Sequence, residues 1–224
     1  METQPISNQE LTEKVSEPDK SRFYVYTIRD WKEYLGESLL IIFSVLLALM
    51  LTEYFNNLHE KENTRITLKN IVAELNHNKT AIEEMKQYNS QVMSKIDSAL
   101  TNKMLQEKLV SNDEFHLFVI APQGVLYRYL ENEAWTIAIN NNVMSKVDAE
   151  TIALLTKVYE DQQRMMKVEE EVAKVIFGRE SRDPTKVHAT LILIRDIYHG
   201  WAVDRTENLL QKIENTIKKI EAEK

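Results

Sequence analysis

Two pairs of an acidic residue and a histidine have the spacing found in metal-binding helices. Glu74 precedes His77 by three positions, and Asp196 precedes His199 by the same interval. Four-helix di-iron proteins take a Glu-x-x-His pair from each of two helices and a further Glu from each of the others. Two such pairs are also expected by chance in a helical chain rich in Glu and Asp. Because His77 lies off the apolar face of its expected helix, we predict that it faces water and that the chain has no metal site.

No other residues have the spacing of a catalytic set. The glycines stand alone, which excludes a glycine-rich phosphate loop, and no nucleophile elbow or zinc-protease pattern can be placed. The absence of Cys excludes Cys-ligated zinc and thiol catalysis. A formal net charge of −7 argues against a nucleic-acid partner, since phosphate contacts need clustered Lys and Arg. We therefore expect a protein that is not an enzyme and binds no cofactor.

The mean hydropathy of −0.39 hides one strongly apolar stretch. Between Leu39 and Leu51 the only polar residue is Ser44, and the segment from Tyr34 to Tyr54 has the length of a membrane-spanning helix, about 30 Å. Aromatic residues, which prefer the lipid–water interface, flank it: Trp31, Tyr34, Tyr54 and Phe55. A transmembrane helix is therefore predicted over residues 35–54. A buried core helix and a secretory signal are the alternatives, but no small-x-small cleavage site follows.

The regions on either side of this helix differ in composition. Residues 1–20 are polar and acidic, which predicts a disordered tail, and residues 21–34 combine aromatic and basic side chains, which predicts a juxtamembrane segment. Residues 55–224 are expected to form an extra-membrane helical domain. Four cations precede the span and three follow it closely, which favours a cytoplasmic N-terminus and an outer C-terminal domain: Lys20, Arg22, Arg29 and Lys32, against Lys61, Arg65 and Lys69.

The absence of Gly and Pro between Gly36 and Pro122 predicts that the span continues as a long helix. Apolar residues recur along it at helical spacing: Leu68, Ile71, Leu75, Ile82, Met85, Val92, Ile96 and Ala99. Asn78 and Asn89 occupy positions in the same seam. Two interpretations remain open, a coiled-coil seam whose Asn residues set the register, and one helix of an ordinary bundle that tolerates two Asn.

The rest of the chain predicts further helices, and so an all-α fold. After a turn at 122–124, helices are expected over 125–139, over 149–178 with Asp148 as N-cap, and from 184 to the C-terminus with a possible kink at Gly200. Together with the long first helix they would form an antiparallel bundle.

Two sets of residues are expected to pack helices together. Glu37, Ser44 and Ala48 share one face of the span, where the small-xxx-small pair would let a second helix approach closely. The alternative for Glu37 is that it merely sits at the membrane interface, where a carboxylate is tolerated. In the outer domain, Trp135 is expected to pack against the helical face that carries Tyr159 and so close a helical hairpin.

Two parts of the chain carry a resemblance to a known family. The sequence from Trp31 through Tyr34-Leu35-Gly36-Glu37-Ser38-Leu39-Leu40-Ile41 leads into the span, and Ala134-Trp135 precedes an apolar helix that reaches Tyr159. This pattern, over residues 30–160, resembles a family of small single-span bacterial membrane proteins described as a domain of unknown function. Many members have a Trp just after the span, where this chain has Tyr54-Phe55. The resemblance implies a bacterial inner-membrane protein and no known activity, substrate or cofactor.

These observations predict a single-pass, membrane-anchored helical protein that acts as a non-enzymatic scaffold or interaction module. Its partners would be the lipid bilayer and either a second copy of the chain or another membrane protein. The alternative is a ligand-sensing or accessory domain of a larger membrane complex.

Overall fold

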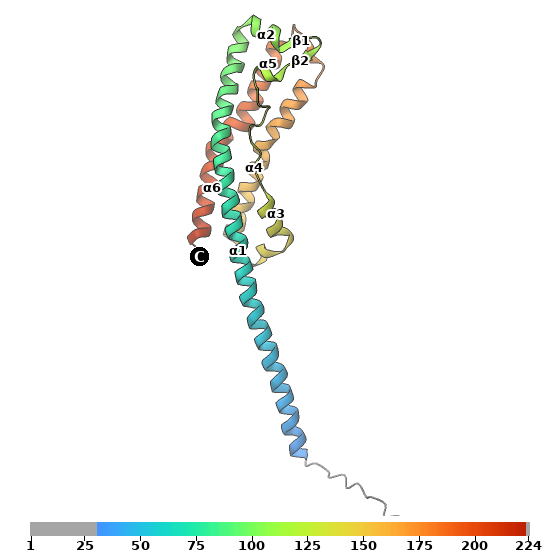
Figure 1. Cartoon of the computed structure of the whole chain (residues 1–224), viewed down its shortest axis with the longest axis vertical. Coiled ribbons are helices and arrows are strands. Elements are labelled where there is room, and N and C mark those ends of the chain that lie inside the picture. The colour runs from blue at the N-terminus through green and yellow to red at the C-terminus, as the bar shows by residue number, and fades with distance from the viewer. Residues whose placement is uncertain (1–30, 223–224) are drawn as a thin grey trace, which may run out of the picture. The chain divides into compact units, whose positions relative to one another are not determined.

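The computed structural model describes residues 31–222, so the expected acidic tail (1–20) and residues 21–30 of the juxtamembrane segment lie outside the described residues. The structure is 83% helical and five of its helices pack against one another, which confirms the all-α prediction (Figure 1). The α-helices are α1 (Trp31–Thr101), α2 (Lys103–Leu109), α3 (Glu133–Asn140), α4 (Ala149–Ile176), α5 (Val187–Tyr198) and α6 (Asp204–Ala222).

Short elements connect these helices. Strands β1 (Val110–Ser111) and β2 (Glu114–Phe115) form a small antiparallel pair in which Val110 lies opposite Phe115. Three single turns are 3₁₀-helical: Leu117–Val119, Val143–Lys146 and Glu180–Arg182. A π-helical turn (His199–Val203) joins α5 to α6 and contains Gly200, the residue at which a kink is predicted.

The chain divides into two compact units between Thr52 and Glu53. In the first unit, which holds the beginning of α1, the described side chains are all exposed. The second unit has a core, to which α1 contributes the seam that the sequence predicts. Seven of the eight seam residues are buried and Leu68 packs against them, and both seam Asn residues are buried as well.

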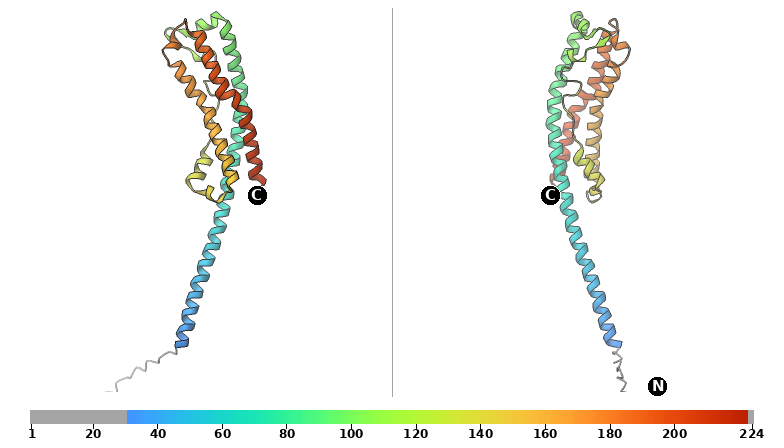
Figure 2. Two further views of the ribbon diagram at one scale, coloured as in Figure 1. Left: turned by 180° about the vertical axis from the view of Figure 1, so that it is seen from behind. Right: turned by 45° about the vertical axis from the view of Figure 1, so that its right-hand side comes forward.

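The directions of the helices differ from those of the antiparallel bundle that the sequence predicts. Beyond Thr52, α1 runs in the same direction as α4, whereas α5 and α6 run in the opposite direction (Figures 1 and 2). Two parallel helices need a return path, and residues 122–132, here called the connecting segment, provide it without helical structure. The prediction of a helix over 125–139 is therefore wrong in its first half, because α3 begins only at Glu133.

The helix ends show which local signals determined the structure. Asp148 caps α4 as predicted, since its carboxylate accepts hydrogen bonds from the N–H groups of Glu150 and Thr151 at 3.0 Å. The last helix is predicted to start at Pro184, but α5 starts at Val187 because Asp183 bonds Thr185 and forms a separate turn. The long helix ends earlier than Pro122.

Helix α1 ends at Thr101, because the side chain of Asn102 caps a new helix, α2. The Asn102 side-chain oxygen accepts hydrogen bonds from the N–H groups of Met104 and Leu105, at 3.0 and 3.3 Å. A residue that caps a following helix has non-helical backbone angles, so α1 cannot continue through it.

Candidate functional site

The apolar beginning of α1 is exposed along its whole length. An 18-residue window of this helix has a mean hydropathy of 2.2, and none of it is buried. Large side chains such as Phe43 and Met50 keep 66% and 72% of their surface accessible. Within residues 31–222, one helix is thus long and apolar enough to cross a membrane. A core helix of a soluble protein would be mostly covered by its own chain, and this one is not.

The expected packing face of the span lies on this exposed helix. The hydroxyl of Ser44 donates to the carbonyl of Leu40 at 2.7 Å, and the hydroxyl of Thr52 donates to the carbonyl of Ala48 at 2.8 Å. Because these hydroxyls bond to their own helix, they add no unsatisfied polar group to an apolar surface. Glu37 and Ala48 are exposed, so the described chain does not cover this face.

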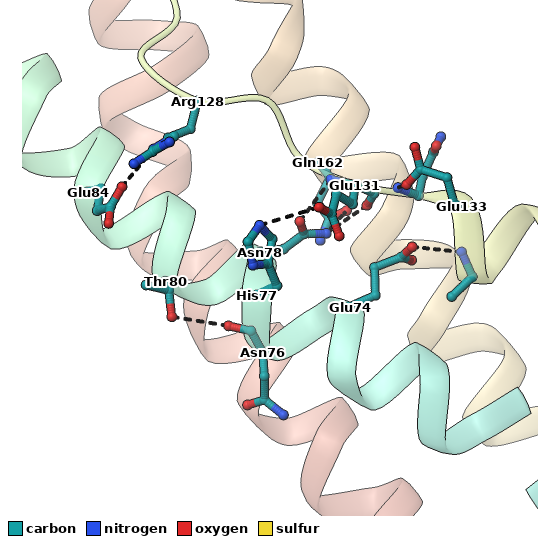
Figure 3. Close-up of polar contacts among 12 residues, drawn as sticks. Glu74, Asn76, His77, Asn78, Thr80, Glu84, Arg128, Glu131, Glu133 and Gln162 are labelled. Atoms are coloured by element: carbon teal, nitrogen blue, oxygen red, sulfur yellow. Dashed lines mark hydrogen bonds and ion pairs between the residues drawn. The ribbon is translucent and has the colours of Figure 1, made fainter. Parts of the chain in front are cut away.

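Glu74 acts as a cap for a helix 60 residues away in sequence. It lies on the buried face of α1, and one of its carboxylate oxygens accepts a hydrogen bond from the N–H of Ala134 at 2.7 Å (Figure 3). The other oxygen lies 3.4 Å from the N–H of Trp135. The first N–H groups of a helix need partners, and Asn132 makes no capping hydrogen bond with its side chain. A negative charge at this end of α3 also suits the helix dipole.

Tyr159 completes this contact, and we call the group of Glu74, Trp135 and Tyr159 the Glu74 junction. The phenol donates to Glu74 at 2.6 Å, and its ring stacks on Trp135 with 5.1 Å between centroids and 6° between planes. The structure thus brings together Trp135 and Tyr159, the two residues expected to close the helical hairpin. Burial and the neighbouring Glu74 carboxylate raise the pKa of the Tyr159 phenol well above its usual range.

Asn78 holds the connecting segment with its side-chain amide. Its Nδ2 donates to the carbonyl of Glu131 at 2.7 Å, and its Oδ1 accepts from the N–H of the same residue at 2.8 Å (Figure 3). The Nδ2 also lies 3.3 Å from Oε1 of Gln162, which belongs to α4. Asn78 therefore satisfies both backbone groups of Glu131 and links α1 to α4.

Two tyrosines hold the first part of the connecting segment in the same manner. The phenol of Tyr88 donates to the carbonyl of Gly124 at 2.7 Å and accepts from the N–H of Gln123 at 3.1 Å. The phenol of Tyr198 donates to the carbonyl of Val125 at 3.1 Å. These side-chain contacts pair backbone groups of Gln123, Gly124 and Val125, where the connecting segment has no helical hydrogen bonds.

The two acid–histidine pairs of the sequence do not form a common site. The side chain of His77 is 63% exposed and lies 3.4 Å from the carboxylate of Glu131, and His199 pairs with Asp204 at 3.0 Å. Among residues 31–222, one group of three potential ligands lies within 4.8 Å, and it consists of Glu74, Glu131 and Glu133 without a histidine. The oxygens of Glu74 already accept hydrogen bonds, so this group has no preformed set of free ligands.

A surface hollow of about 430 Å³, here called the basal groove, lies between α1, the start of α4 and the end of α6. Its lining includes three cationic side chains, Lys61, Arg65 and Lys146, and three apolar ones, Leu68, Val147 and Ile220. In the sequence, Lys61 and Arg65 stand out only as cations that follow the predicted span. Lys146 is distant in sequence, so no local pattern indicates this groove.

No protein-family model, curated protein or solved structure matches the chain. Function is therefore inferred from the chain's own residues and contacts.

Replacing Asn78 with Ala should destabilise the outer domain by about 2 to 3 kcal/mol, because both backbone groups of Glu131 lose their partner while they remain partly buried. Asn76→Ala is the matched control. Asn76 lies on the exposed side of α1, and its side-chain amide donates to the carbonyl of Val72 in the same helix. Both substitutions change Asn to Ala within α1, so both variants gain the same helix propensity. Urea unfolding of the detergent-solubilised chain measures both. Equal effects of the two substitutions would contradict the role given to Asn78.

Replacing Tyr159 with Phe should change how stability depends on pH. The folded-state pKa of this phenol is raised above the unfolded value of about 10, so its contribution is present below pH 10 and is lost as the pH rises above it. The variant should be about 1 to 3 kcal/mol less stable at pH 8, and the difference from the wild type should shrink above pH 10.

Tyr129→Phe serves as the control for this experiment. Its phenol is also bonded to a carboxylate, that of Glu169 at 2.9 Å, but the side chain is exposed, so the loss should stay below about 0.5 kcal/mol. Urea unfolding between pH 7 and 11 gives both curves. A Tyr159→Phe curve parallel to that of the wild type above pH 10 would show that this phenol does not titrate differently in the folded state.

Proposed function

We propose that the protein is a single-pass membrane protein whose helical domain outside the membrane acts as a scaffold or interaction module. The observation that carries this proposal is the apolar part of α1, which is long enough for a bilayer and contains no buried residue. Soluble monomers rarely expose contiguous apolar patches beyond a few hundred Å². A lipid environment removes that surface from water, at roughly 25 cal/mol for each Å².

The contacts in the outer domain support an interaction role more than a catalytic one. Glu74 and Asn78, two buried polar side chains of α1, satisfy backbone groups of the connecting segment and α3. The acid–histidine pairs are divided between separate contacts, His77 with Glu131 and His199 with Asp204. Groups used in this manner hold the domain in one arrangement and leave its outer faces to meet partners.

The second candidate is a ligand-binding accessory domain of a larger membrane complex. The basal groove favours it, because this hollow of about 430 Å³ combines cationic and apolar side chains. Pockets for small ligands have this volume and this mixture of apolar walls with a few charged groups.

The membrane placement follows the resemblance and the charge distribution. We assign the chain to a bacterial inner membrane on the family resemblance of residues 30–160. The cations around the span favour a cytoplasmic N-terminus and an outer C-terminal domain.

Insertion and orientation can be tested together with a reporter enzyme that is active only outside the cytoplasm. When it is fused after Lys224, the reporter should be active, and the fusion should stay in the membrane pellet after alkaline carbonate treatment. Leu46→Arg should reduce both signals, because an arginine at the centre of a span costs about 2.5 to 3.5 kcal/mol on insertion.

Ile66→Arg is the matched control for this substitution. Ile66 lies on the same helix beyond the apolar segment and is 46% exposed, so the same change there should leave insertion unaffected. A carbonate-soluble wild-type chain would contradict the membrane assignment. An inserted chain with a silent reporter would contradict only the orientation.

The span face formed by Glu37, Ser44 and Ala48 is proposed to pack against a second membrane helix, supplied by another copy or by another subunit. Ala48→Leu should weaken self-association of the full chain in mild detergent by about tenfold, since the larger side chain keeps helices apart. Glu37→Ala should weaken it as well, whereas Met50→Leu, a conservative change elsewhere on the span, should not. Analytical ultracentrifugation measures this, and a monomer unchanged by all three substitutions would exclude self-association through this face.

A further inference from the structure

The lining of the basal groove includes three exposed cationic side chains, here called the rim cations, and three apolar side chains that are buried or half-buried. On α1, the lining positions Lys61, Arg65 and Leu68 recur at helical spacing and so share one face. Lys146 and Val147 face them from the turn before α4, and Ile220 comes from the last turn of α6. A second hollow of about 260 Å³ also borders Lys61 and Lys146, so these two lysines stand between two open volumes.

This arrangement suits an anionic ligand. Lys61 and Lys146 can meet a phosphate or a carboxylate as point charges. One carboxylate, that of Asp148, also borders the groove, but it accepts hydrogen bonds from the first N–H groups of α4.

Two of the rim cations are paired with carboxylates, and a ligand can replace one of these pairs. Arg65 binds Glu62 through two parallel hydrogen bonds, at 2.6 and 2.9 Å, so its hydrogen-bonding edge is already occupied. Lys146 forms a single ion pair with Glu60 at 3.0 Å, both side chains are more than half exposed, and pairs of this kind contribute little to stability. A phospholipid phosphate, whose single negative charge is shared by two oxygens, can therefore take the place of the Glu60 carboxylate at Lys146.

The position of the groove along the chain indicates where such a ligand would come from. Lys61 follows Phe55, the aromatic residue at the end of the apolar segment, by six residues in the same helix, which is about 9 Å of helix. The headgroup region of a bilayer extends about 5 to 7 Å beyond its hydrocarbon core. Lys and Arg side chains extend their charged ends toward such an interface.

We propose that the basal groove binds the phosphate group of an anionic phospholipid. This inference rests on the proposed membrane anchoring. Free phosphate presents the same oxygens to the lysines, so the experiment below separates the two sources. Binding of the lipid would tie the outer domain to the membrane surface at a second point beside the helix itself.

The test uses the full chain in a zwitterionic detergent, to which a short-chain phosphatidylglycerol is added. Native mass spectrometry gives the dissociation constant of the lipid adduct. The double variant Lys61→Gln, Lys146→Gln should weaken binding at least tenfold. Lys69→Gln, which makes the same change at an exposed position of α1 outside the groove, should alter it less than twofold.

One further variant separates a ligand-binding role from a structural one. Glu60→Gln removes the carboxylate that competes for Lys146, so it should strengthen lipid binding about threefold. A structural role for the ion pair predicts instead that Glu60→Gln and the lysine variants all weaken binding.

Two control ligands decide the chemistry. Phosphatidylcholine of the same chain length should bind at least tenfold more weakly than phosphatidylglycerol, and tenfold excess inorganic phosphate should not displace the lipid. Equal binding of the two lipids, or equal effects of the groove and Lys69 substitutions, would overturn the proposal. Displacement by inorganic phosphate would assign the groove to free phosphate instead. Each of these outcomes can occur in a chain that inserts normally, so they are distinct from failure of the membrane anchoring.

Discussion

The outer domain depends on one constraint, which is that the backbone of the connecting segment must find hydrogen-bond partners outside itself. Because α1 and α4 run in the same direction, the chain has to return along the bundle between them. A return path without helix or strand leaves its N–H and C=O groups to be satisfied by side chains where they are covered and by water where they are exposed. Asn78 and Tyr88 of α1 and Tyr198 of α5 supply those partners, and Glu74 supplies them for the start of α3.

These contacts select one arrangement of the domain more than they raise its total stability. A typical hydrogen bond adds only about 1 kcal/mol net, because it replaces a bond to water. An unpaired group in the interior is more damaging, since it loses that water without compensation. The amide of Asn78 matches both backbone groups of Glu131, and a shifted register of the connecting segment would leave all of these groups unpaired. Gln162 is less well matched, since its Nε2 is buried without a hydrogen bond within residues 31–222.

The sequence predicts those parts of the fold that local patterns control. Apolar spacing identifies the buried face of α1, and the Asp148 cap is recognised by its residue type alone. The first half of the helix expected over 125–139 does not form, and backbone groups of the connecting segment are bound instead by Asn78, Tyr88 and Tyr198, which are 35 to 73 residues away in sequence. No window along the chain contains both partners of such a contact.

The residues of the candidate site could not be predicted fully for the same reason, which is that their partners are distant in sequence. Glu74 matches a metal-binding spacing with His77, but the spacing does not reveal that the carboxylate faces α3 while the imidazole faces water. Asn78 in an apolar seam has the same appearance whether it meets an Asn of another copy or a backbone of its own chain. The structure shows the second arrangement, in which Asn78 binds the backbone of Glu131. A polar residue in an apolar seam therefore indicates that the packing register is specified there, but it does not identify the partner.

The two units of the chain differ in how their polar groups are paired and in whether their apolar side chains are buried. In the second unit, buried side-chain polar groups are paired within the chain, as Glu74 is with Tyr159 and the start of α3, and Nε2 of Gln162 is the exception within residues 31–222. Between Leu39 and Thr52 the hydroxyls of Ser44 and Thr52 are paired with their own helix, and the other exposed side chains are apolar. A helix that satisfies its own polar groups and leaves its apolar surface uncovered has the properties that a lipid environment requires. The second unit packs its own core without any contribution from this apolar surface.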